Sequence, residues 1–284
     1  MKVKREVGIH LRIKKNYKEI AAKGKKLGAS ALQFFLMPQD SDKYLKPTKE
    51  DQEGFLKISQ KHFSNSYIHS SYWVAPANGK EVSAKVSVKY LKREIAIAKQ
   101  LEIKTIVFHA GAASGFPFNE EEPDNRTAGI KAVANVLNTI LKNEKNITLL
   151  LENTTHGNKM VCSDFYDFVK LKPLLHFPEQ VGFCLDTAHA YAYGYDITHT
   201  DDFLDFLDET MGIENIKLIH LNDSEKELGS KLDKHALVNE GLIEKEFLKK
   251  IVNHEKLKHV PIILEPPEMD EKRIKKIIKE VQRW

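Results

Sequence analysis

Eight short apolar runs recur along the chain, and they constrain its fold more than any other feature of the sequence. The runs are rich in Val, Ile, Leu and Phe, and each is shorter than a typical helix. Because they are apolar on both faces, they are typical of strands buried in a parallel sheet. They occupy residues 7–10, 30–36, 66–69, 105–109, 147–152, 181–186, 216–221 and 260–265.

The segments between most of these runs have the period of an amphipathic helix. Leu91, Ile95 and Ala98, for example, share one apolar stripe, and lysines occupy the other faces of that segment. Gly28 and Gly212 each follow such a segment and predict the end of a helix. Helices are predicted at residues 17–27, 82–101, 128–141, 165–171, 203–211, 247–252 and 274–281.

This alternation predicts a (β/α)₈ barrel, or TIM barrel, of class α/β with a parallel eight-stranded core. Such a barrel takes about 250 residues, and this chain has 284. No linker or low-complexity segment divides the sequence, so we expect a single domain over residues 1–284. No GxGxxG or GxxxxGK[ST] motif follows a run, which argues against the open nucleotide-binding sheets.

The composition excludes several classes of protein. There are 44 Lys and Arg against 40 Asp and Glu, and this net charge of +4 permits a phosphate-rich partner without requiring one. No apolar run approaches the roughly 18 residues of a membrane span, and the first residues lack the apolar core of an export signal. The two cysteines, Cys162 and Cys184, cannot form a disulfide framework. We therefore expect a cytoplasmic monomer of enzyme size with no membrane contact.

Ionisable side chains end or closely follow most of the runs. All strands of a parallel barrel end at the same face, so these side chains are expected to meet at one opening. An imidazole or carboxylate at the end of an apolar strand is costly unless it is paired or bound to a cation. The residues concerned are His69, His109, Glu152, Asp186, His189, His220, Asp233, His235 and Glu265.

This mixture of imidazoles and carboxylates predicts a transition-metal site. Nitrogen and oxygen ligands together suit Zn²⁺, or less selectively Mn²⁺ or Fe²⁺, whereas Mg²⁺ and Ca²⁺ prefer oxygen ligands alone. The set can hold three ions if one carboxylate bridges, and four carboxylates with three divalent ions leave a net charge of about +2 that attracts phosphate. The residues alone thus predict a multi-zinc phosphoesterase, with His10 beside the ligands rather than among them.

Two long motifs resemble endonuclease IV, the family of zinc-dependent apurinic/apyrimidinic (AP) endonucleases of base-excision repair. They are CLDTAHAYAYGYD at 184–196 and HLNDSEKELGSKLDKHALVNEG at 220–241, supported by LLLENTTHG at 149–157 and YIHSSYW at 67–73. The resemblance covers nearly the whole chain. It implies a nuclease that acts in the nucleoid on double-stranded DNA containing abasic sites. The nuclease would cleave 5′ to the site, leaving a 3′-hydroxyl and a 5′-deoxyribose phosphate.

The resemblance also implies a role for each ligand in a trinuclear zinc site, with Mn²⁺ as an alternative metal. The first group would hold one ion. The second group would hold another ion and share Glu152 with the first group, and the third group would hold the last ion. Glu152 would position the attacking nucleophile, with Glu265 as its catalytic neighbour. The groups are His69, His109 and Glu152; Glu152, Asp186, His220 and Glu265; and His189, Asp233 and His235.

The resemblance implies DNA contacts as well. Tyr72 and Trp73 would insert where the base is missing, and Lys231 and Lys234 would contact phosphates. The alternatives are a packed loop anchor for the aromatic pair and ordinary solvated positions for the lysines. The loops after the first, second and last runs, at 11–17, 35–44 and 264–269, depart from the family pattern. The second of these loops carries Asp40 and Asp42, which would repel phosphate.

Two other classes stay open on the sequence. A single-metal sugar isomerase or epimerase on the same barrel would use residues like Glu152, Asp186, His220 and Glu265. It would have no use for the remaining histidines and Asp233 as ligands, so metal content separates the two enzymes. The other class is a non-catalytic protein that binds damaged DNA, which would bind an abasic duplex without nicking it.

Overall fold

The strands of the chain close into a parallel barrel, as predicted. The computed structural model describes residues 5–38, 41, 43–117, 119–157, 159–267 and 269–284. Around the barrel the strand order is β1-β10-β7-β6-β5-β4-β3-β2, and every neighbouring pair is parallel. The strands are β1 (Val7–Leu11), β2 (Ala31–Phe35), β3 (Asn65–His69), β4 (Thr105–His109), β5 (Thr148–Glu152), β6 (Val181–Asp186), β7 (Ile216–His220) and β10 (Ile262–Leu264).

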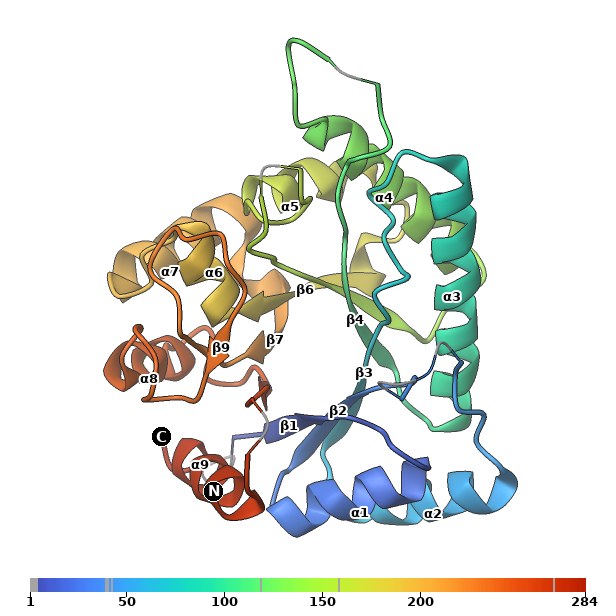
Figure 1. The fold of residues 1–284 in the computed structure, drawn as a ribbon, viewed down its shortest axis with the longest axis vertical. Coiled ribbons are helices and arrows are strands. Elements are labelled where there is room, and N and C mark those ends of the chain that lie inside the picture. The colour runs from blue at the N-terminus through green and yellow to red at the C-terminus, as the bar shows by residue number, and fades with distance from the viewer. Residues whose placement is uncertain (1–4, 39–40, 42, 118, 158, 268) are drawn as a thin grey trace.

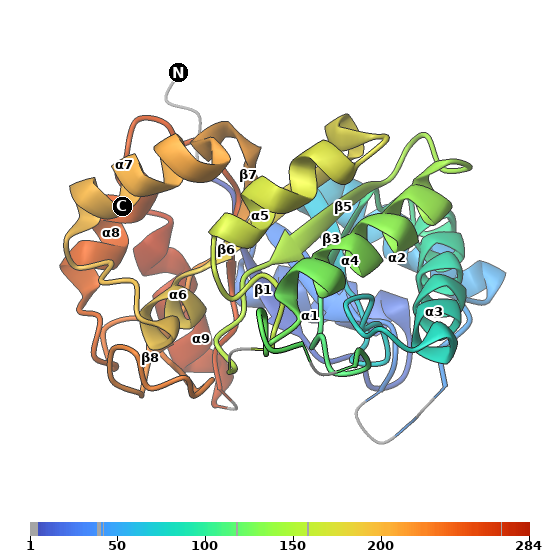
Figure 2. The same cartoon turned by 90° about the horizontal axis from the view of Figure 1, so that it is seen from above.

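Helices surround the strands, as Figure 1 shows, and the view at 90° in Figure 2 agrees. Their apolar stripes pack against the outside of the barrel and form most of the core. Among the described residues, no helix is long and apolar enough to cross a membrane. The helices are α1 (Tyr17–Leu27), α2 (Lys49–His62), α3 (Glu81–Gln100), α4 (Arg126–Leu141), α5 (Tyr166–Leu171), α6 (Thr187–Tyr193), α7 (Thr200–Met211), α8 (Lys245–Asn253) and α9 (Glu271–Val281).

Local signals in the sequence account for several helix ends. The side chain of Asn16 caps α1 by accepting from the backbone N–H of Glu19. Gly28 ends the same helix at φ +83°, in the left-handed region that favours glycine. Gly212 ends α7 at φ +74°. Both predicted helix ends are therefore confirmed.

Two α-helices and one β-hairpin were not predicted. Helix α2 buries only Phe55 and Ser59, so its apolar stripe is too thin to recognise. Helix α6 is short and lies inside the motif that follows β6. Strands β8 (Asp223–Ser224) and β9 (His235–Ala236) form an antiparallel hairpin beside α6, in the loop after β7 (Figure 1).

The last predicted run, 260–265, is longer than the strand that forms. Strand β10 spans only Ile262–Leu264. Pro261 comes directly before it and has no N–H to add to the ladder of hydrogen bonds. Glu265 therefore lies just beyond the strand end, where it faces the opening of the barrel.

Candidate metal centre

The alternation of side chains along the strands builds the site. Seven buried residues form a layer inside the barrel: Ala31, Tyr67, Val107, Leu150, Cys184, Leu218 and Ile263. Because side chains in a strand alternate between the two faces, the residue two positions later also points inward. This places one further layer at the carboxyl end of the strands. Its members are Gln33, His69, His109, Glu152, Asp186, His220 and Glu265.

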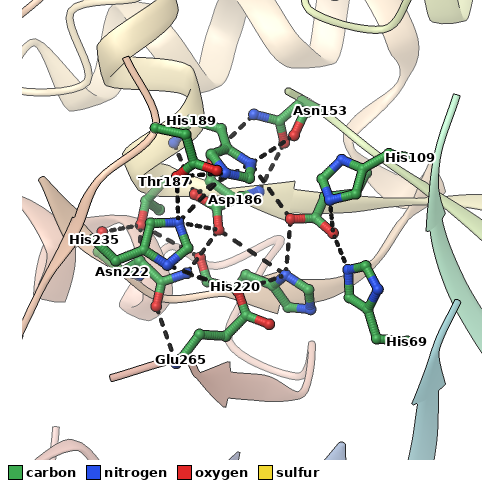
Figure 3. A network of polar contacts seen from close by, with 12 residues as sticks. His69, His109, Asn153, Asp186, Thr187, His189, His220, Asn222, His235 and Glu265 are labelled. Atoms are coloured by element: carbon green, nitrogen blue, oxygen red, sulfur yellow. Dashed lines mark hydrogen bonds and ion pairs between the residues drawn. The ribbon is translucent and has the colours of Figure 1, made fainter. Parts of the chain in front are cut away.

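The first group of predicted ligands is centred on one oxygen of Glu152. Its Oε2 lies 3.0 Å from Nε2 of His69 and 3.6 Å from Nε2 of His109. His69 and Glu152 are buried, and His109 is partly exposed. The ligand atoms of all three residues lie within 4.8 Å of one another, close enough to hold one ion (Figure 3).

The second group is centred on the other oxygen of the same carboxylate. Oε1 of Glu152 lies 3.1 Å from Nδ1 of His220. That Nδ1 atom is also 3.4 Å from Oε2 of Glu265 and 4.0 Å from Oδ2 of Asp186. Glu152 thus presents one oxygen to each group, which is the arrangement that a bridging carboxylate requires.

The third group forms an equilateral triangle of ligand atoms. Nε2 of His189, Nε2 of His235 and Oδ1 of Asp233 are 3.3 Å apart in each pair. Edges of this length fit a tetrahedral centre about 2.0 Å from each atom, close to the bond lengths that zinc makes with nitrogen and oxygen. Asp186 lies next to the triangle, with Oδ2 at 3.7 Å from Nε2 of His235, and its ligand atom and those of His189 and His235 lie within 4.8 Å of one another.

Backbone carbonyls fix the ring nitrogens of two histidines. Nδ1 of His69 lies 2.9 Å from the carbonyl oxygen of Ser70, and Nδ1 of His189 lies 2.8 Å from that of Asn153. Since a carbonyl only accepts, each Nδ1 carries its hydrogen in this contact. Nε2 of each ring then faces its ligand group and is the atom that would bind a metal, as is usual for metal-binding histidines.

Burial and charge act in opposite directions on the pKa values of these groups. Burial alone would raise the pKa of Glu152, but the nearby His220 and His109 hold it well below its usual value. Burial lowers the pKa of His109 to about 4, so this ring is neutral near pH 7. Burial alone would raise the pKa of Asp233, but the hydrogen bond and the charge of His189 lower this pKa to about 2. Glu152 and Asp233 are therefore ready to bind cations, whereas burial raises the pKa of Asp186.

Neutral amides that the sequence analysis missed support Asp186. Nδ2 of Asn222 donates to Oδ2 of Asp186 at 2.6 Å. Asn153 donates to the backbone carbonyl of Asp186 at 3.0 Å and accepts from its N–H at 2.7 Å. The only sequence signal is position, because Asn153 directly follows Glu152 and Asn222 lies two residues after His220. His156 was also missed, and its Nε2 lies 3.9 Å from Oδ2 of Asp233.

His10 lies beside the ligand groups, where the sequence predicted it. Its Nδ1 is 2.7 Å from Oε1 of Glu265, and its side chain is mostly buried. The ligand groups open into a cavity of about 910 Å³, whose other lining residues include the basic Arg12, Lys14 and Lys23. Cationic walls of this kind attract anionic substrates.

The predicted DNA-contact residues lie in two different settings. Tyr72 and Trp73 follow β3 with exposed fractions of 83% and 57%, and Tyr72 lines the cavity. Nζ of Lys231 lies 3.3 Å from the ring centroid of Tyr193 and donates to the carbonyl oxygen of the same residue. Nζ of Lys234 pairs with Glu225 at 2.5 Å but stays largely exposed. Lys231 is thus half-buried against Tyr193, and Asp40 and Asp42 lie outside the described residues.

Comparisons with known proteins identify the family of this chain. Residues 21–284 match the family described as xylose isomerase-like TIM barrel. A protein of Mesomycoplasma hyopneumoniae (strain 7448) named "Probable endonuclease 4" is 32% identical over 277 residues, or 95% of either chain. One of the same name from Thermosipho melanesiensis is 31% identical over 268 residues, or 92% of either chain.

Solved structures extend the comparison. The crystal structure of endonuclease IV from Thermus thermophilus superposes with a TM-score of 0.81 at 26% identity, covering 98% of this chain and 99% of that one. A D-tagatose 3-epimerase-like protein reaches 0.72 at 17% identity, over 98% and 97% of the chains, which shows a shared fold alone. The chain therefore belongs to the endonuclease IV family of xylose isomerase-like TIM barrels.

Proposed function

We propose that this chain is a zinc-dependent AP endonuclease of DNA repair. It hydrolyses the phosphodiester 5′ to an abasic site in double-stranded DNA, leaving a 3′-hydroxyl and a 5′-deoxyribose phosphate. One observation carries the proposal: the nine predicted ligands meet at a single opening of the barrel, in three groups, the first two of which share Glu152. The names of the relatives support the nuclease activity.

The donor set fits three zinc ions. His69, His109 and Glu152 would hold the first ion, and the triangle of His189, Asp233 and His235 would hold the third. The ligands of the second ion would be Glu152, Asp186, His220 and Glu265. Zinc at these positions supplies Lewis-acid stabilisation of the charge that develops on the phosphoryl oxygens.

The residues of the chain would orient the substrate at this site. Glu152 is almost completely buried and touches both of the first two ligand groups, so it is placed to orient the attacking water relative to the phosphate. Glu265 lies beside it at the cavity edge. The exposed rings of Tyr72 and Trp73 would fill the gap left by the missing base, since apolar and aromatic wedges stabilise unstacked DNA. Lys234 and Lys231 would contact phosphates of the DNA backbone.

The sugar isomerase or epimerase is the second candidate. It rests on the shared fold and on the second ligand group, which alone would hold a single ion. The triangle of His189, Asp233 and His235 argues against it, because three atoms at zinc-like spacing would serve no purpose in a one-metal enzyme. We further propose that the chain acts as a cytoplasmic monomer with one domain over residues 1–284.

The test is cleavage of a DNA duplex that carries one tetrahydrofuran analogue of an abasic site. The zinc-loaded protein should nick the strand directly 5′ to the analogue, and excess chelator should stop the reaction. Metal analysis of the same sample should give about three zinc ions per chain. Binding without nicking would favour the non-catalytic class, and one ion per chain with no nicking would favour the sugar enzyme.

A further inference from the structure

We propose that Gln33 is a positioning residue for the second ligand group. In this role it fixes which ring nitrogen of His220 and which oxygen of Glu265 face the metal. The inference rests on the proposed function, because it takes both residues as ligands. Gln33 lies on β2, and its side chain is completely buried in the layer at the carboxyl end of the barrel. A buried amide in such a layer needs partners for its polar atoms.

The charge of Glu265 sets the orientation of the amide. Nε2 of Gln33 lies 3.0 Å from Oε1 of Glu265. A carboxylate only accepts hydrogen bonds, so Gln33 must turn its NH₂ group to this side. Its carbonyl oxygen must then face the opposite side of the site.

The orientation of the amide in turn selects the ring nitrogen of His220. Oε1 of Gln33 lies 3.0 Å from Nε2 of His220. Because this oxygen only accepts, Nε2 must carry a hydrogen. The other nitrogen, Nδ1, is left to face the ligand group, where Oε1 of Glu152 lies 3.1 Å away. One amide thus connects two ligands that are 45 residues apart in sequence, His220 and Glu265.

His10 completes the arrangement from the neighbouring strand. His10 and Gln33 are register partners in β1 and β2, and Nδ1 of His10 lies 2.7 Å from the same Oε1 of Glu265. Nδ1 of His10 and Nε2 of Gln33 lie 2.9 Å apart, and because a carboxylate only accepts, both direct an N–H at this oxygen. The second oxygen of Glu265, Oε2, faces Nδ1 of His220 at 3.4 Å. It also accepts from Nδ2 of Asn222 at 3.3 Å, and its remaining lone pair would face the metal.

The proposal predicts the behaviour of Gln33→Met, which keeps the volume but removes the hydrogen bonds to Glu265 and His220. The ring proton on Nε2 of His220 should lose its acceptor and exchange with water about 2- to 10-fold faster, the factor expected for one hydrogen bond. The rate is measured by ¹⁵N-histidine NMR in the zinc-free full-length chain, with the signal assigned by its loss in His220→Asn. Titration with zinc should show one of the bound ions held about 10- to 100-fold more weakly, as for other contacts behind metal ligands.

Gln180→Met is the matched control. Gln180 donates to the carbonyl oxygens of Glu144 and Ile147 just before β6, at the opposite end of the barrel. This substitution should change neither the exchange rate of His220 nor the affinity for zinc. Unchanged exchange and unchanged zinc affinity in a folded Gln33→Met protein would overturn the proposal.

Gln33→Glu provides a second variant if the methionine does not fold. Its carboxylate can still accept from Nε2 of His220 but places a second negative charge beside Glu265. We expect the ring proton of His220 to exchange as slowly as in wild type, while zinc binds more weakly. Zinc binding equal to that of wild type would overturn the proposed role of Gln33 at Glu265. The exchange measurement uses neither zinc nor DNA, so it decides the role of Gln33 even if the chain proves not to cleave abasic DNA.

Discussion

Glu152 contacts His69 through only one of its carboxylate oxygens, with Oε2 at 3.0 Å from Nε2 of the ring. The other oxygen faces Nδ1 of His220 at 3.1 Å. A single buried side chain therefore links two ligand groups contributed by strands β3, β4, β5, β6 and β7 and by Glu265 just after β10. Removing its charge should affect both groups at once, while the barrel itself is held by other contacts.

The first prediction concerns Glu152→Gln. The amide cannot serve two cations as a charged bridge, so nicking of the abasic duplex should fall at least about 10²-fold, the lower range for a positioned catalytic group. Circular dichroism should show an intact fold. Glu144→Gln is the control, because Glu144 pairs with Lys99 away from the cavity and should leave nicking unchanged. Wild-type turnover in Glu152→Gln would refute the catalytic role.

The second prediction concerns the triangle of ligand atoms. Asp233→Asn removes the charged oxygen that lies 3.3 Å from both His189 and His235. The zinc content should fall from about three to about two ions per chain, because neutral amides are poor zinc ligands. Metal analysis after dialysis gives the count. Asp201→Asn, which removes only an exposed pair with Lys250, should keep all the zinc. A full complement of zinc in Asp233→Asn would mean that this residue is not a ligand.

The third prediction concerns the aromatic pair after β3. Each of Tyr72→Ala and Trp73→Ala should weaken binding to abasic DNA by about 5- to 150-fold, the range for one lost stacking contact. Because both side chains are largely exposed, zinc content and melting temperature should change little. Fluorescence anisotropy with a labelled duplex measures the affinity. Tyr166→Ala, an exposed tyrosine on α5, should bind DNA normally. Equal loss of zinc and DNA binding would show that the loop is structural.

The fourth prediction concerns a buried carboxylate beneath the same loop. Glu94, on α3, accepts from Oγ of Ser70 at 2.5 Å, the N–H of Ser71 at 3.0 Å and the hydroxyl of Tyr44 at 2.8 Å. Burial raises the pKa of Glu94 above its usual 4.5, although these hydrogen bonds oppose the shift. The folded chain therefore holds this proton more tightly than the unfolded chain does.

The sign of the pH effect follows from this difference. As the pH rises from 4.5 through the raised pKa of Glu94, the unfolded state loses its proton first, so this residue contributes less to stability. Glu94→Gln cannot titrate, so its free energy of unfolding should improve relative to wild type across that range. Urea melts at several pH values measure the difference. Glu209→Gln, at an exposed position, is the control, and its free energy of unfolding should change with pH as that of wild type does. A difference between Glu94→Gln and wild type that stays constant over this pH range would contradict the prediction.

Much of the site could be predicted because strand geometry is local. Side chains in a strand alternate, and parallel strands of a barrel all end at one face, so His69, His109 and Glu152 could be placed together from their positions alone. Residue type then indicated the metal. The helix ends at Gly28 and Gly212 were predictable for the same reason, since each depends on the conformation of one residue.

Other features depended on tertiary structure. Gln33, Asn153 and Asn222 are neutral amides with no distinctive sequence pattern, and their roles follow from partners on other strands. The weakly amphipathic α2 forms because the barrel offers it a surface for Phe55. The sequence by itself determined which side chains reach the opening of the barrel. Only the closed barrel decided which atom of each faces which neighbour, because hydrogen bonds and charge pairs depend on distances between strands that are remote in the chain.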